Sequence, residues 1–303
     1  MHTYQQKDPD DDVITALATG TGGALNVIRL SGRGCLDVAR QVWRGKKFWR
    51  VPRTLCLGRV ISIPEGTLID RGLAVFFKGP HSYTGEDVVE FHLHGGGAVA
   101  RQCLQALLAA GARFAEAGEF TRRAFLNGKL DLTQAEAVND VIRAHSELAL
   151  RLAQRQLDGA LGKVLRRLYD ELTMLRADCE AHLDFPDEDL DLPPVSEMEA
   201  SVSRIIDQVN RLLQTGRMGE MVRQGVRVAI VGPPNAGKSS LLNCILGQDR
   251  AIVTHFPGTT RDTLEALAHI GQIPVCLVDT AGIRETDNPI EQEGIRRSFR
   301  TIA

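Results

Sequence analysis

No run of apolar residues in the 303-residue sequence approaches the about 20 residues that a helix needs to span a bilayer. The first 12 residues are acidic, and they lack both the apolar centre of a secretory signal and the Arg-rich pattern of a transit peptide. We therefore expect a cytoplasmic protein with no membrane partner. In a eukaryotic source, the expected compartment is the mitochondrion, with the transit peptide missing from this sequence.

The sequence also lacks paired cysteines and a large excess of charge. Its six cysteines are scattered without a CxxC pair, which argues against a zinc site or a disulfide framework and fits a reducing compartment. The formal net charge is −2, whereas proteins held on nucleic acid mainly by phosphate contacts are usually basic. No basic patch with interleaved aromatic residues stands out, so the sequence does not place a direct contact with RNA.

Residues 1–127 are predicted to form a small α/β or α+β domain. Short runs rich in Val, Ile, Leu and Phe alternate with Gly-containing turns, as in strands. The expected strands cover 25–30, 55–63, 73–77 and 88–93, and the one clear helix covers 98–110 and ends at Gly111.

Residues 128–222 are predicted to be helical. Leucines at steps of four and three place one apolar stripe on a first helix, namely Leu157, Leu161, Leu165, Leu168, Leu172 and Leu175. After a break at Pro186 and Pro193, a second helix is expected to carry an inner face of Val202, Ile205, Ile206, Val209, Leu212 and Leu213.

Residues 223–303 begin with a predicted strand, 226–231, that leads directly into a glycine-rich loop. GPPNAGKS at 232–239 matches the pattern GxxxxGK[ST], in which backbone N–H groups and the start of the following helix (239–246) hold phosphates. Lys238 would reach the β- and γ-phosphates, and the Ser239 hydroxyl would bind Mg²⁺. The alternative, a Gly/Pro turn before a surface helix, is disfavoured by the strand–loop–helix order.

A second nucleotide-binding element follows a further predicted strand, 274–278. Asp279 begins the sequence DTAG, which places a carboxylate and a backbone N–H where GTPases contact Mg²⁺ and the γ-phosphate. Between the two elements, GTTRD at 258–262 is interpreted as the switch whose Thr completes the Mg²⁺ shell. Together they predict an incomplete P-loop GTPase domain of the Ras/Era-like fold.

The residue that orients the attacking water in Ras-like enzymes is missing. Those enzymes have a Gln after DxxG, whereas this sequence has Ile283, which neither donates nor accepts a hydrogen bond. Glu285, Glu291 and Glu293 are acidic candidates downstream, although a solvated surface carboxylate is the commoner role for each of them.

The motifs together resemble those of the MnmE (TrmE) family of tRNA-modifying GTPases. They are GPPNAGKSS, PGTTRD and DTAGIRETDNPIEQEG, preceded by HSYTGEDVVEFHLHGG at 81–96, AGEFTRRAFLNGKLDLTQAEA at 117–137 and DFPDEDLD at 184–191. They run in family order from about Val13 to the last residue. The resemblance implies an N-terminal folate-binding and dimerisation domain, a helical domain, and a GTPase domain inserted into the helical domain.

The resemblance also implies an activity. Members hydrolyse GTP in a K⁺-activated reaction while the wobble uridine of certain tRNAs receives an aminomethyl or carboxymethylaminomethyl group at C5. The implied partners are a second copy of the chain, an FAD-containing MnmG-type protein, and tRNA through that complex. The implied ligands are GTP, Mg²⁺, K⁺ and 5-formyltetrahydrofolate or a related tetrahydrofolate, which supplies the one-carbon unit.

The site residues follow from the matched motifs. Glu291, which would orient the attacking water through a bridging molecule, and Lys238 are the expected catalytic residues. Ser239 and Thr260 would bind Mg²⁺. Potassium would be held by Asn235, Thr254, Phe256 and Thr259. The full set expected to bind GTP is Asn235, Ala236, Gly237, Lys238, Ser239, Ser240, Thr254, Thr259, Thr260, Asp279, Thr280, Ala281 and Gly282.

In the N-terminal domain, Arg29, Glu90 and Lys129 match positions that line the folate pocket of the family. Their charges suit a ligand with a glutamate tail and a pterin. Glu90 also shares one strand face with His92 and His94, but this pattern is weak evidence for a metal. The nearby Arg122 and Arg123 are interpreted, with Lys129, as a solvated or folate-facing surface.

The sequence departs from the family pattern in two places. Residues 19–26 keep the glycines of a family loop but lack its basic residue, which puts contacts of the folate domain or its dimer interface in doubt. No guanine-selecting NKxD or SA[KL] motif follows DTAG, and the second half of the helical domain is also missing. We therefore expect a fragment or a truncated gene product.

Two other functions stay open. One is a folate-binding and dimerisation module without GTPase activity, which would bind nucleotides weakly and without base preference. The other is an Era-like GTPase of ribosome assembly, against which the GEFTRRAF block argues. The sequence identifies neither the organism nor the tRNAs, and it leaves open whether the chain hydrolyses GTP alone.

Overall fold

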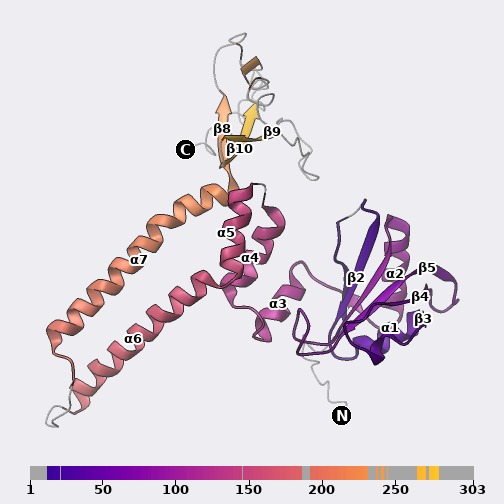
Figure 1. The fold of residues 1–303 in the computed structure, drawn as a ribbon, viewed down its shortest axis with the longest axis horizontal. Helices are drawn as coiled ribbons and strands as arrows, with labels where there is room; N and C mark the ends of the chain where they lie inside the picture. Colours follow the sequence, from indigo (N-terminus) through magenta and orange to yellow (C-terminus); the bar gives the residue numbers. More distant parts are fainter. Residues whose placement is uncertain are drawn as a thin grey trace, which may run out of the picture. The chain divides into compact units, whose positions relative to one another are not determined.

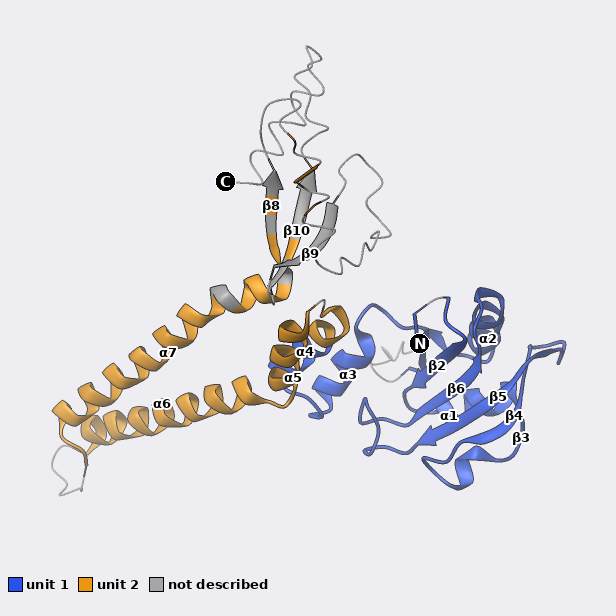
Figure 2. Cartoon of the chain, turned by 45° about the horizontal axis from the view of Figure 1, so that its top comes forward, with its two compact units in different colours: residues 1–138 blue, residues 139–303 orange. Residues whose placement is uncertain are grey.

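The computed structural model describes residues 12–20, 22–144, 146–185, 192–230, 237, 240–241, 244, 265–270 and 273–279. The chain divides into two compact units, residues 1–138 and 139–303 (Figure 2). An α+β part followed by a helical part confirms the expected mixture of helix and sheet. Within the described ranges, no helix has both the length and the apolar character for crossing a membrane.

The first unit contains a seven-stranded sheet in the order β3-β4-β5-β6-β2-β1-β7. Neighbouring strands pair antiparallel, except that β1 and β7 run parallel. The strands are β1 (Ile14–Leu17), β2 (Leu25–Ser31), β3 (Trp43–Gly45), β4 (Cys56–Ile61), β5 (Leu68–Phe77), β6 (Val88–His94) and β7 (Arg113–Phe114).

Two helices, α1 (Cys35–Val42) and α2 (Gly97–Ala109), pack on one face of this sheet and form the core with it (Figure 1). The strands alternate accordingly, as β6 shows: Val89, Phe91 and Leu93 are buried in the core, while Glu90 and His92 point to the opposite side. We call that opposite side the second face. A short helix, α3 (Glu119–Leu126), follows β7.

The expected strands and α2 are present with small shifts at their ends, except that β5 begins five residues earlier than expected, at Leu68. The sequence predicted one clear helix in this domain, α2, whereas the structure also contains α1 and α3. Helix α1 was missed because it starts directly after a Gly-rich turn that includes Gly34, whose φ is +87°. Its core positions, Cys35, Val38, Ala39 and Val42, do follow the helical spacing.

The helical part consists of α4 (Leu132–Arg143), α5 (Glu147–Leu157), α6 (Ala160–Asp184) and α7 (Val195–Gln224). Helix α7 runs back alongside α6 (Figure 1), and Arg167 donates to Gln208 across the pair at 3.0 Å. Leu168 and Ile205 are buried, whereas most of the other stripe residues are not: Leu165, Leu172, Val202, Ile206, Val209 and Leu213 are all exposed. The expected inner face was therefore too wide, because two paired helices bury only the residues along their line of contact.

The last described elements form a three-stranded sheet in the order β8-β10-β9. Strands β8 (Val226–Ile230) and β10 (Ile273–Asp279) pair parallel, and β9 (Glu265–Ile270) pairs antiparallel with β10. The described part of the expected strand 226–231 forms β8, residue 231 lying outside the described residues, and β10 extends the expected strand 274–278 by one residue at each end. Asp279 is the last residue of β10, as expected for a carboxylate at the end of a strand.

Candidate functional site

Arg29 and Glu90 form an ion pair on the second face of the sheet. They are direct partners across β2 and β6, and Arg29 Nε donates to Glu90 Oε1 at 2.7 Å. Both side chains are partly accessible, at 25% and 14%. The other Glu90 oxygen lies 3.4 Å from His92 Nε2. Two residues that the sequence assigned to one pocket, far apart along the chain, are thus in contact.

Two aromatic rings flank the guanidinium of Arg29. Its Cζ lies 5.3 Å from the ring centroid of Tyr83 and 5.6 Å from that of Phe120. Tyr83 belongs to the loop between β5 and β6, and Phe120 to α3; the Tyr83 hydroxyl is 2.9 Å from Thr121 Oγ1. The sequence reading did not single out Tyr83 or Phe120, although both lie in the motif blocks 81–96 and 117–137.

The terminal nitrogens of Arg29 are open to a ligand. Among the described residues, neither Nη atom has a hydrogen-bond partner, since the only such bond of this side chain comes from Nε. The guanidinium therefore offers a fork of donors beside the two rings and next to a carboxylate. This set can hold a planar ligand that has both an acidic group and hydrogen-bond donors.

Lys129 lies against the same loop at a different point. Its Nζ donates to Pro80 O at 3.1 Å, and Asn127 Nδ2 donates to Thr84 O at 2.8 Å. A Cβ on Gly85 would lie 2.9 Å from Asn127 Cβ and 3.3 Å from Lys129 Cγ. The turn after α3 thus packs closely on the loop that carries Tyr83, and Lys129 contacts that loop instead of Arg29 or Glu90.

His94 is separate from this group. Its backbone N donates to Asp70 Oδ2 at 2.8 Å, and its Nδ1 lies 2.9 Å from Asp70 Oδ1. Glu90 therefore contacts both Arg29 and His92, whereas His94 bonds to Asp70.

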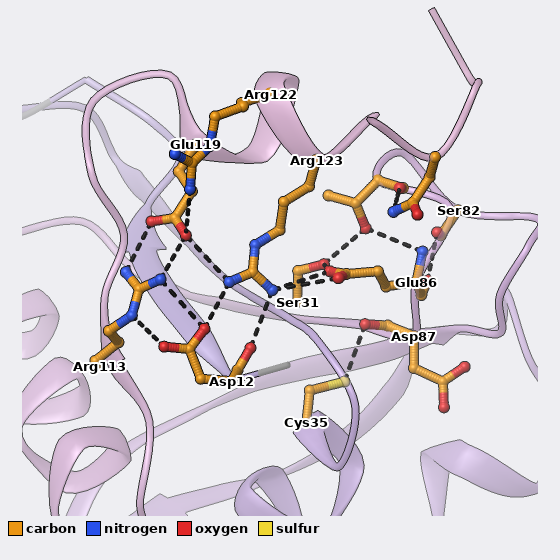
Figure 3. Close-up of polar contacts among 12 residues, drawn as sticks. Asp12, Ser31, Cys35, Ser82, Glu86, Asp87, Arg113, Glu119, Arg122 and Arg123 are labelled. Atoms are coloured by element: carbon orange, nitrogen blue, oxygen red, sulfur yellow. Dashed lines mark hydrogen bonds and ion pairs between the residues drawn. The ribbon is translucent and has the colours of Figure 1, made fainter. Parts of the chain in front are cut away.

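An ionic cluster centred on the buried side chains of Glu119 and Arg123 joins α3 to the loop before β6 (Figure 3). We call its members, Asp12, Glu86, Arg113, Glu119 and Arg123, the ionic brace. Arg123 Nη2 donates to Asp12 Oδ1 at 2.7 Å and to Glu119 Oε1 at 3.1 Å, and its Nη1 donates to Glu86 Oε1 at 3.2 Å. Arg113 Nη2 donates to Glu119 Oε1 at 2.6 Å and pairs with Asp12 through its Nε.

The ionic brace links four segments of the first unit: the segment before β1, the loop before β6, β7 and α3. It also positions the loop, because Ser31 Oγ donates to Glu86 Oε2 at 2.7 Å and lies 2.6 Å from Thr84 Oγ1. The interpretation of Arg123 as a surface residue was wrong, since its side chain is 1% exposed. Adjacent residues on a helix point in different directions, and Arg122 is half-exposed.

The arginines of the ionic brace hold two of its carboxylates, those of Glu119 and Asp12, in the ionised form. The hydrogen bond from Arg113, with that from Arg123, lowers the pKa of Glu119 to about 2 despite burial, which opposes ionisation. Burial raises the pKa of Asp12, but bonds from Arg113 and Arg123 outweigh it and leave that pKa below its ordinary value.

These lowered pKa values predict acid lability. A group whose pKa is lower in the folded state stabilises the fold above its unfolded pKa and loses this contribution as pH falls towards the folded value. We expect the thermal unfolding midpoint to fall between about pH 5 and pH 2 as Glu119 and Asp12 are protonated. The measurement is thermal unfolding across this range for the wild type and Glu119→Gln. An equal pH slope in both proteins would contradict the assignment.

Most of the expected nucleotide-site residues lie outside the described part of the chain. These are Asn235, Ala236, Lys238, Ser239, Thr254, Phe256, Thr259, Thr260, Thr280, Ala281, Gly282 and Glu291. Of the described members, Gly237 has φ +81°, Ser240 is helical, and Asp279 ends β10 beside β8. Leu241 N donates to Gly237 O at 2.9 Å, a bond between residues four apart as in an α-helix.

Comparison with known proteins gives consistent results along the chain. The family model for the GTP-binding protein TrmE N-terminus matches residues 13–129, and that for the MnmE helical domain matches residues 132–301. The protein named tRNA modification GTPase MnmE of Akkermansia muciniphila is 48% identical over 297 residues, which cover 97% of this chain and 66% of the relative. Those of Aquifex aeolicus and of one strain of Thermus thermophilus are each 47% identical over 95% of this chain, covering 64% and 66% of the relatives. The chain thus spans slightly less than two thirds of the length of these relatives.

Proposed function

The chain belongs to the MnmE family, and on this premise we propose that it acts in tRNA modification as a GTPase that also binds a reduced folate. The proposal of folate binding rests mainly on the Arg29 guanidinium. It pairs with Glu90 through Nε and lies beside Tyr83 and Phe120, and neither Nη atom has a hydrogen-bond partner among the described residues. Relatives named tRNA modification GTPase support the nucleotide part.

The proposed folate ligand is 5-formyltetrahydrofolate or a related tetrahydrofolate. The Arg29 fork suits a carboxylate of the glutamate tail or an acceptor of the pterin, and Glu90 suits the donors of the pterin. The flanking rings suit the aromatic part of the ligand. Lys129, which contacts the loop that carries Tyr83, would help to close the pocket. The bound folate would supply a one-carbon unit for C5 of a wobble uridine.

In the proposed nucleotide site, Lys238 and Ser239 bind the phosphates and Mg²⁺, with Thr260 completing the metal shell and Asp279 beside it. Asn235, Thr254, Phe256 and Thr259 hold K⁺, and Glu291 orients the attacking water in place of the missing Gln. Thr280, Ala281, Gly282, Ala236, Gly237 and Ser240 complete the GTP contacts. The proposed partners are a second copy of the chain, an FAD-containing MnmG-type protein, and tRNA through that complex.

We expect GTP hydrolysis by the purified chain to require K⁺ and to depend on Glu291. The rate measured in KCl should fall to the background in NaCl, and Glu291→Ala should lower it about 100-fold or more because the water loses its orienting base. Glu293→Ala, two residues further on, is the matched control and should keep the wild-type rate. Hydrolysis that is equal in both salts would contradict the K⁺ site.

A second candidate is a folate-binding and dimerisation module without GTPase activity. It is favoured by the fact that Arg29, Glu90, Tyr83 and Phe120 all lie in the first unit, so that folate binding needs no residue after 138. Folate binding with no hydrolysis in either salt would support this candidate over the first.

A further inference from the structure

Three arginines form a row across neighbouring strands on the second face of the sheet. Arg44 on β3 is the direct partner of Arg59 on β4, and Arg59 is the direct partner of Arg71 on β5. All three are exposed. Their neighbours Val60 and Gly72 point to the opposite, helix-covered face, where Gly72 lies against Leu93. We call Arg44, Arg59 and Arg71 the arginine row.

The arginine row has no carboxylate partner among the residues that the structure describes. Arg44 Nη1 donates only to carbonyl oxygens at the end of α1 and in β3, at 3.0–3.4 Å. The carboxylate of Asp70, next to Arg71 in sequence, accepts from His94 and from the backbone N of Arg71, not from the Arg71 guanidinium. Like charges that face each other directly across strands destabilise a sheet. The row is therefore an unfavourable arrangement for folding, which a bound anion would relieve.

The surroundings of the arginine row add further positive charge. Residues 40–53 contain six Lys or Arg residues and no Asp or Glu. Lys46, Lys47 and Arg50, which follow Arg44, are exposed and form no ion pair within the described part of the chain. The expectation that no basic patch stands out was therefore wrong. The run 40–53 was visible in the sequence, but the alignment of Arg59 and Arg71 with it depends on strand register.

The arginine row shares a face with the Arg29–Glu90 pair. The next residues along the strands on this face, Leu57, Leu73 and His92, are cross-strand partners, and the following row contains Val75, Glu90 and Arg29. Arg71 and Val75 are four residues apart on β5, which is about 13 Å. A polymer bound on the row would thus lie close to the proposed folate pocket.

We propose that the arginine row is a docking surface for the phosphate backbone of RNA. Neighbouring strands are about 5 Å apart, so the row presents guanidinium groups at regular intervals, which suits a chain of phosphates better than one isolated anion. Arginine binds phosphate with two parallel hydrogen bonds and is favoured in nucleic-acid recognition. That the RNA is a tRNA rests on the proposed function.

The test compares two variants with equal loss of charge. The row variant is Arg44→Gln with Arg59→Gln and Arg71→Gln, and the control is Arg33→Gln with Arg101→Gln and Arg155→Gln, which are exposed elsewhere. Binding of a fluorescein-labelled tRNA to the full chain is followed by anisotropy from 50 to 200 mM KCl. The logarithm of affinity falls linearly with the logarithm of salt concentration, and removal of three phosphate contacts should make this slope less steep by about 2–3. Wild-type affinity should therefore fall about 20- to 40-fold more over this range than that of the row variant.

Two further readouts separate the possible outcomes. The row variant should unfold at no lower temperature than the wild type, because like charges are removed, and it should keep 5-formyltetrahydrofolate binding. Equal salt slopes in the row variant and the control would overturn the proposal. It would also be overturned if the row variant lost binding to phosphatidylserine vesicles but bound tRNA as the wild type does. Weaker tRNA binding by the row variant would support the proposal even if the chain binds no folate. Failure of the proposed folate function and failure of the RNA-docking proposal therefore give different results.

Discussion

Arg123→Met is expected to lower the free energy of unfolding of the first unit by about 3–5 kcal/mol, as seen when one partner of a buried ion pair is removed. Arg123 contacts three carboxylates, those of Asp12, Glu86 and Glu119, and its side chain is 1% exposed. Without it, the fully buried carboxylate of Glu119 loses an arginine partner, and so do the partly buried carboxylates of Asp12 and Glu86. Methionine fills much of the volume, so the expected loss reflects charge more than packing.

Urea denaturation monitored by tryptophan fluorescence measures this effect, since both tryptophans, Trp43 and Trp49, lie in the first unit. The matched control is Arg122→Met. Arg122 is half-exposed, with Glu119 at 3.6 Å, and exposed ion pairs contribute about 1 kcal/mol or less. A loss below about 1 kcal/mol for Arg123→Met, or equal losses for both variants, would show that the ionic brace does not hold the unit together.

Arg29→Met is expected to weaken the binding of 5-formyltetrahydrofolate about 10- to 100-fold. A hydrogen bond to a charged group contributes about 1.5–3 kcal/mol, and each 1.4 kcal/mol corresponds to a tenfold change in affinity. The variant removes the open Nη donors but leaves an apolar stem between Tyr83 and Phe120. Isothermal titration measures the affinity directly.

Arg33→Met is the control for this titration. Arg33 lies just after β2 and is exposed, so its removal changes the net charge equally without touching the Arg29–Glu90 pair. Unchanged affinity in Arg29→Met would place the ligand elsewhere. Circular dichroism of both variants establishes that the comparison is between folded proteins.

The sequence predicted those elements whose spacing of apolar residues shows clearly which side is buried. Strand β6 and helix α2 have clear apolar patterns, and their ends were placed within one residue. Strand β1 and helix α1 were missed because both lie next to Gly-rich turns, which mask their short patterns. On α6, spacing alone did not distinguish buried Leu168 from exposed Leu165, because the choice depends on where α7 crosses.

The same limit applies to the site. Motif comparison found Arg29 and Glu90, but not Tyr83 and Phe120, whose role beside Arg29 depends on the packing of α3 and the loop. Arg122 and Arg123 are adjacent and chemically equal, so only the structure shows which one is buried. The arginine row depends on the register of three strands, which no local pattern encodes.

Titration of 5-formyltetrahydrofolate into the purified wild-type chain at neutral pH shows directly whether the chain binds folate through Arg29. We expect saturable binding at one site per chain, with an affinity that Arg33→Met preserves and Arg29→Met lowers at least tenfold. Absence of binding by a folded wild-type chain, or binding that does not respond to Arg29→Met, would contradict the assignment of the Arg29–Glu90 pair as the folate site.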